Sequence, residues 1–150
     1  MVWGNMKRLF LTLAAILTLG SLASAEEWLT DYAKALAQAK TQNRPVLIDF
    51  TGSDWCGWCM KLDKEVFSLE DFKSYAAQKL VLLKIDFPRR KPLPAAEAAQ
   101  NQKLANQFNV QGFPTVVVLK PDGTKAGELG YTPGGPKAFI AELEKVTPKK

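Results

Sequence analysis

Cys56 and Cys59 are the only cysteines in this chain of 150 residues, and they lie three positions apart. Asp49 precedes them inside the apolar run "VLIDF", where a carboxylate is unusual. Two thiols at this spacing can exchange disulfides, contribute to a zinc site, attach haem or form a structural disulfide. A buried acid close to such a pair can also take up or release a proton. Redox chemistry is therefore one of four uses to be weighed.

The other three uses of the cysteine pair fit less well. Structural zinc needs four ligands, and the chain has no histidine and no further cysteine, so only a dimer sharing four thiolates could complete a site. Covalent haem needs a histidine after the second cysteine, and that position is Met60. A structural disulfide would close a very short loop and constrain the unfolded chain little. Thiol–disulfide exchange fits best, and no cofactor or metal is expected.

The sequence around the pair predicts a helix that starts at or just before Cys56 and runs to about Phe67. At the first turn Cys56 would face unpaired N–H groups and the positive end of the helix dipole, which favour its thiolate. Cys59 would lie about one turn later on the same face. We therefore predict that Cys56 attacks and that Cys59 resolves the mixed disulfide.

Helices and strands are predicted to alternate along the rest of the chain. Trp28 is expected on the apolar face of a first helix that stops at Asn43, and Ser68 with Asp71 predicts the cap of another short helix. Strands are predicted over 45–50 and 79–87, a helix over 95–110, a hairpin over 114–131 and a closing helix over 134–146. This order predicts one three-layer α/β domain, with a parallel sheet that is covered on both faces and ends in an antiparallel hairpin.

The first 25 residues predict a secretory signal peptide. Lys7 and Arg8 precede an apolar stretch over 9–19, and Ala23 and Ala25 stand at an A-x-A cleavage position. The stretch is short for a membrane span, which is the alternative. We expect domain boundaries at 1–25 and 26–150, and a soluble mature protein in the periplasm or outside the cell.

The formal net charge is +5, but the basic residues are dispersed and resemble no nucleic-acid module. The exception is the run Arg89, Arg90 and Lys91 within "FPRRKPLP". This run is interpreted as a solvated loop, with an acidic docking site as the sharper alternative.

The combination of "DWCGWC" after a buried strand, Asp49, and the later "GFPT" resembles the thioredoxin family. Within that family the sequence is most similar to secreted bacterial members and to the thioredoxin-like domain of the membrane thiol transporter, over roughly residues 28–146. The resemblance implies a thioredoxin-like three-layer sandwich with a mixed central sheet. It also implies a cis-proline at Pro114, whose loop faces the disulfide. It further implies a buried acid at Asp49 that takes a proton from Cys59. Asp49 and Cys56 are seven positions apart, one more than in thioredoxin.

Aromatic residues near the pair are candidates for contact with an extended peptide, and they are Trp55, Trp58, Phe113 and Tyr131. For Trp55, packing under the active-site loop is an equal alternative, whereas Trp58 is expected to be exposed. Trp58 also replaces the proline that thioredoxin has between its cysteines, so its amide is expected to donate to Cys56. That donor would make the potential less negative than the roughly −270 mV of thioredoxin. Residues 88–109 form an insertion relative to thioredoxin. This insertion either helps to select partners or is a surface insertion without a role.

The sequence thus predicts a monomeric oxidoreductase that exchanges disulfides with the thiols and disulfides of proteins. A reductase in an oxidising compartment would need electrons from a membrane thiol transporter. Reductase, oxidase and isomerase share these residues, so the direction of transfer stays open. A non-catalytic peptide-binding module with the same fold is the alternative.

Overall fold

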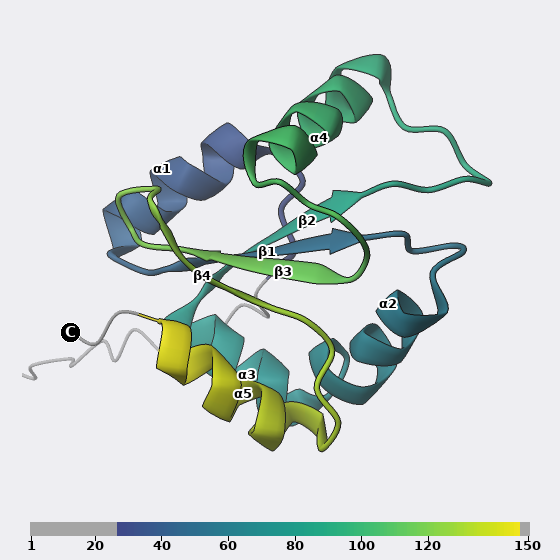
Figure 1. The fold of residues 1–150 in the computed structure, drawn as a ribbon. Coiled ribbons are helices and arrows are strands. Elements are labelled where there is room, and N and C mark those ends of the chain that lie inside the picture. The colour runs from purple at the N-terminus through teal and green to yellow at the C-terminus, as the bar shows by residue number, and fades with distance from the viewer. Residues whose placement is uncertain (1–26, 148–150) are drawn as a thin grey trace, which may run out of the picture.

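The structure is a computed structural model that describes residues 27–147; the predicted signal peptide lies outside these residues. A four-stranded sheet forms the centre, with helices on both faces (Figure 1). The helical elements are α1 (Tyr32–Gln42), α2 (Gly57–Leu62), the π-helix η1 (Asp63–Phe67), α3 (Glu70–Lys79), α4 (Ala95–Gln107) and α5 (Gly135–Val146). The strands are β1 (Val46–Thr51), β2 (Val81–Asp86), β3 (Thr115–Leu119) and β4 (Lys125–Leu129).

The sheet is mixed and has the strand order β2-β1-β3-β4. β1 and β2 are parallel, and β3 is antiparallel to both β1 and β4. The sequence predicts parallel strands up to the final hairpin. This prediction is wrong for the pairing of β1 with β3, which is antiparallel. Thr115 pairs with Phe50, so β3 begins where β1 ends and runs back along it. The mixed sheet implied by the family resemblance is correct.

The two faces of the sheet carry separate hydrophobic cores because side chains alternate along each strand. α1 and α4 cover the face to which Ile48 and Phe50 point, and α3, α5 and the α2–η1 segment cover the face of Leu47 (Figure 1). By the same alternation Asp49 points to the face of Leu47, under α2 and η1. The sequence of β1 thus directs its one acid toward the helix that follows Cys56.

Two local predictions about helix ends are wrong. Helix α1 begins at Tyr32, with Asp31 accepting the amide of Lys34 at 2.9 Å, so Trp28 precedes it. The Trp28 ring instead lies 5.2 Å from that of Phe67, in the core on the other face. Ser68 does not cap α3: its hydroxyl donates to Asp63 at 3.1 Å.

Other helix ends follow the sequence. Asn43 ends α1 in the left-handed conformation, with φ 51°. Helix α2 continues directly into η1, so the helical segment ends at Phe67 as predicted. Among residues 27–147, none of the helices has the length and apolar character needed to cross a lipid bilayer.

Candidate active site

The two cysteines form a disulfide at the start of α2, with their Cα atoms 5.2 Å apart. Cys56 is the N-cap of the helix, and its Sγ accepts the amide N–H of Cys59 at 3.2 Å. Cys56 and Cys59 are 7% and 4% exposed, respectively. The donor to Cys56 is therefore the amide of Cys59, and the expected donation from Trp58 is not the one that occurs. A hydrogen bond to this sulfur favours its ionised form once the disulfide is reduced.

Asp49 lies at the centre of β1, opposite Lys84 of β2 and Val116 of β3. It is only 5% exposed, and its Oδ1 has no hydrogen-bond partner among residues 27–147. The carboxyl group is on the same side of the sheet as the helical segment that carries Cys59. Asp63, one turn beyond Cys59, is close enough to influence Asp49 electrostatically. The structure thus puts the acid and the cysteine pair on one face of the sheet.

Burial raises the pKa of Asp49 from 3.8 to about 7. The charge of Lys84 opposes this shift, and the nearby Asp63 and Asp86 carboxylates add to it. A carboxyl group with a pKa near neutrality can exchange a proton at physiological pH. The environment of Asp49 therefore suits the predicted role as the acid–base group for Cys59. A carboxylate with a purely structural role would normally keep its ordinary low pKa and be ionised.

Trp55 is packed under the loop that leads to the cysteines. Its indole N–H donates to the carbonyl of Phe87 at 2.7 Å, and its ring meets that of Phe113 edge-on, with centroids 5.9 Å apart. The guanidinium of Arg89 lies 3.7 Å from the ring centroid. These contacts favour the packing interpretation of Trp55 and leave a part-buried ring at the rim.

A network of hydrogen bonds joins the loop before Cys56 to the loop after β2. The carboxylate of Asp54 accepts the amides of Arg89 at 3.0 Å and Arg90 at 2.7 Å, and these bonds lower the pKa of Asp54. Asp86 accepts both the amide and the hydroxyl of Ser53, at 2.9 and 2.5 Å. The two loops extend beyond the same end of the sheet (Figure 1). The segment after β2 is thus built into the wall of the site.

Helix α4, the main part of the 88–109 insertion, is anchored by polar contacts. Buried Asn101 donates to the carbonyl of Asp86 at 2.9 Å. Gln100 donates to the carbonyl of Thr30 at 2.9 Å and accepts the amide of Tyr32 at 3.0 Å. The insertion therefore packs against the domain and positions the 87–91 loop.

The peptide bond between Phe113 and Pro114 is cis, as the family resemblance implied. The ring of Phe113 lies between those of Trp55 and Phe87, with centroids 5.9 and 5.2 Å away. Through these rings the Pro114 loop meets both loops of the site. The contact of Pro114 with a substrate backbone stays a prediction.

Trp58 lies between the two cysteines in the sequence and is 58% exposed. Its ring is 5.2 Å from that of Tyr131, and Lys61 Nζ lies 5.1 Å above one ring and 5.2 Å above the other. The Tyr131 hydroxyl donates to Glu65 at 2.5 Å, a bond that raises its pKa. The exposed ring of Trp58 and the half-buried ring of Tyr131 thus form an aromatic surface beside the disulfide, and its contact with a peptide stays a prediction.

A family model described as a thioredoxin-like domain matches residues 32–147. The chain belongs to the thioredoxin-like family. With its Cys56–Cys59 disulfide it is a thioredoxin-like disulfide oxidoreductase.

Relatives of this thioredoxin-like protein include two from Chlamydia pneumoniae. It is 33% identical to "Disulfide bond reductase DsbH" over 123 residues, covering 82% of this chain and 74% of the relative. It is 29% identical to "Thioredoxin-related protein DsbJ", covering 89% of this chain but 42% of that protein. The solved structure "DsbH Oxidoreductase" superposes with a TM-score of 0.77 at 31% identity, covering 87% of this chain and 91% of that one.

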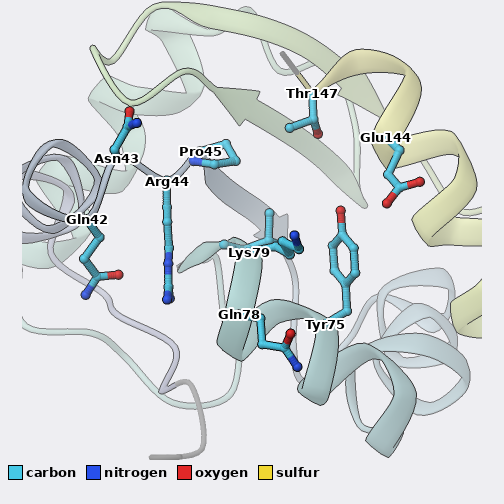
Figure 2. Close-up of a pocket in the computed structure, with 10 residues that line it drawn as sticks. Gln42, Asn43, Arg44, Pro45, Tyr75, Gln78, Lys79, Glu144 and Thr147 are labelled. Carbon is cyan, nitrogen blue, oxygen red and sulfur yellow. The ribbon is translucent and has the colours of Figure 1, made fainter. Parts of the chain in front are cut away.

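A pocket of about 600 Å³ (Figure 2) includes Pro45, next to the start of β1, whereas the disulfide follows the other end of this strand. It is formed where α1, α3 and α5 end, with Arg44, Tyr75, Lys79, Glu144 and Thr147 among its lining residues. None of the residues around the disulfide contributes to it. The pocket is therefore separate from the disulfide.

Several residues at the site were not foreseen. The sequence pattern does not single out Asp54 or Asp86, yet these two acids hold the two loops together. It does not predict the stacking of Arg89 on Trp55 either. These contacts join residues more than 30 positions apart, and no local pattern reveals them.

Gly52 allows this close packing, and its substitution is the first test. A Cβ at residue 52 would lie 2.6 Å from Trp55 Nε1, so Gly52→Ala should displace the ring and destabilise the fold by about 1–3 kcal/mol. Urea unfolding measures this change. Gly57→Ala is the matched control, because a Cβ there meets nothing within 4 Å; equal stability of the two variants would contradict the close packing.

Proposed function

We propose that this protein is an exported oxidoreductase that reduces disulfides in protein substrates, with Cys56 as the attacking thiol and Cys59 as the resolving thiol. The observation that carries the proposal is the disulfide at the N-cap of α2, where Cys56 Sγ accepts an amide N–H. Reduction is the favoured direction because DsbH, similar over most of both chains, is named a disulfide bond reductase.

The proposed reaction has two exchange steps. The Cys56 thiolate attacks one sulfur of a substrate disulfide, which forms a mixed disulfide and releases the other substrate sulfur as a thiolate. Cys59, deprotonated with the help of Asp49, then attacks Cys56 Sγ. The Cys56–Cys59 disulfide forms, the second substrate sulfur leaves as a thiol, and two electrons have passed to the substrate.

The surroundings of the cysteines suit this assignment. Asp49 is buried on the face covered by the helical segment of Cys59 and has a pKa of about 7. The Pro114 loop, Trp58, Phe113 and Tyr131 are proposed to hold an extended segment of the substrate. We propose a membrane thiol transporter as the source of electrons, on the strength of the family resemblance.

The direct test follows electrons into a protein disulfide. Protein recovered from the exported fraction, with an intact mass that corresponds to a start at Glu26, is reduced and mixed with insulin. Each molecule should reduce one insulin disulfide and regain the Cys56–Cys59 disulfide, as mass analysis after alkylation would show. Binding of insulin without loss of protein thiols would favour the non-catalytic peptide-binding module.

A further inference from the structure

The 87–91 loop forms one edge of the active site, and its backbone is fixed. The Phe87 carbonyl accepts the indole N–H of Trp55 at 2.7 Å. The amides of Arg89 and Arg90 both donate to the carboxylate of Asp54, at 3.0 and 2.7 Å. The loop is therefore held against the residues that precede Cys56, irrespective of what its side chains do.

The side chains of this loop are cationic and exposed. Arg89, Arg90 and Lys91 all face solvent, and the guanidinium of Arg89 stacks 3.7 Å above Trp55, the residue next to Cys56. Asp54 and Asp86 lie at the same edge, and the neutral amides and Ser53 that they bind do not cancel the charge of a carboxylate. The three cations outnumber these two acids, so the edge carries a net positive charge next to Trp55, the residue before Cys56.

A second cation lies beside the other cysteine. Lys61 Nζ is 5.1 Å above the exposed ring of Trp58, the residue next to Cys59. It also forms an ion pair of 4.0 Å with Glu65, which accepts the hydroxyl of Tyr131. Each cysteine therefore has a neighbouring tryptophan that carries a cation on its ring. A guanidinium stacked on an aromatic face keeps its N–H edge available to a carboxylate.

We propose that the 89–91 run is a docking element for acidic protein segments, so that favoured partners carry Asp or Glu close to their reacting cysteine. This inference rests on the proposed exchange with protein disulfides. It adds that the partner segment is negatively charged. Three cations on one short, fixed loop match a short acidic segment better than a broad anionic surface. Complementary charge would mainly raise the rate of encounter.

The test compares disulfide-bonded peptides of equal length that carry acidic, neutral or basic residues beside the cysteine. With the reduced wild-type protein at low ionic strength, the acidic peptide should react about ten times faster than the neutral one. This preference should shrink toward unity at high ionic strength, because salt screens exposed charges. Stopped-flow tryptophan fluorescence gives the rate constants.

Two doubly substituted proteins locate the effect. R90E/K91E reverses the loop charge but keeps the amides that bind Asp54, and it should bring the acidic-to-neutral rate ratio below one. K40E/K79E makes the same change in net charge at the opposite end of the domain, where these lysines line pockets distant from the disulfide. Its rate ratio should equal that of the wild-type protein.

The possible outcomes distinguish failure of the docking element from failure of the proposed oxidoreductase function. An unchanged ratio in R90E/K91E, or an equal fall in K40E/K79E, overturns the docking element. Loss of binding to anionic lipid vesicles in R90E/K91E, with the peptide preference intact, assigns the run to a membrane surface and also overturns it. Absence of exchange with every peptide would instead overturn the proposed oxidoreductase function.

Discussion

Cys56→Ser should lower the rate of mixed-disulfide formation by on the order of a thousandfold or more. Cys56 is the N-cap of α2 and its sulfur accepts an amide N–H, so the reduced group is stabilised as a thiolate. A serine hydroxyl is not ionised near neutral pH and cannot attack a disulfide at a useful rate. Single-turnover reaction of the reduced variant with a chromogenic disulfide measures the loss.

Cys59→Ser should behave differently because the attacking thiol remains. Mixed disulfide should form at nearly the wild-type rate and then persist, since the group that releases the substrate is missing. A covalent complex should therefore accumulate on a non-reducing gel. The Cys56→Ser/Cys59→Ser double variant controls for non-covalent binding. Accumulation of the complex in Cys56→Ser through Cys59 would reverse the two roles.

Asp49→Asn should stabilise the oxidised protein at alkaline pH by up to about 4 kcal/mol. The carboxyl group has a pKa of about 7 in the folded protein and an ordinary value of 3.8. Between about pH 4 and pH 7 the folded protein therefore keeps a proton that the unfolded chain has released. The free energy of unfolding of the wild-type protein therefore decreases as the pH rises from about 4 through 7. Asparagine has a similar size and does not ionise, so this decrease should disappear.

Urea unfolding at pH 5 and pH 8 measures the effect as the difference between wild type and variant. Asp71→Asn serves as the control, because Asp71 is an exposed carboxylate on α3. Its curve should run parallel to that of the wild-type protein over this range. A parallel curve for Asp49→Asn would mean that Asp49 is not held protonated by burial.

Asp49→Asn should also slow resolution of the mixed disulfide by about 10- to 100-fold. It should slow formation of the mixed disulfide less. The wild-type rate of resolution should rise through pH 7 as the Asp49 carboxylate forms, and the variant should lack this rise. Equal rates of resolution in the two proteins would leave Asp49 with a purely structural role.

Short patterns predicted the central elements of this site. The continuous apolar run of β1 and the cysteine at the start of α2 are local signals, and the structure has both. The alternation of side chains along β1 then fixes the face on which Asp49 lies. The cis bond before Pro114 came from the family resemblance, because nothing in the local sequence requires it.

The errors arose where a side-chain contact formed in the fold overrides the pattern that predicts a helix end. Trp28 has helical spacing from Tyr32, but its ring packs on Phe67 and α1 begins only at Tyr32. Ser68 could cap α3, but Asp63 of the preceding turn accepts its hydroxyl. The choice between packing and substrate contact for Trp55 depends on Phe87, Arg89 and Gly52, and their proximity is a product of the fold.

The attachment of the 87–91 loop through its backbone has a consequence for protein engineering. Because Asp54 binds the amides of Arg89 and Arg90, any residue other than proline at these two positions can keep the anchoring bonds. The side chains can therefore be exchanged while the backbone anchor stays, and of the two only Arg89 would lose a described contact, its stacking on Trp55. This short segment is thus a natural graft position, where new partners could be selected from a library while the redox centre stays as it is.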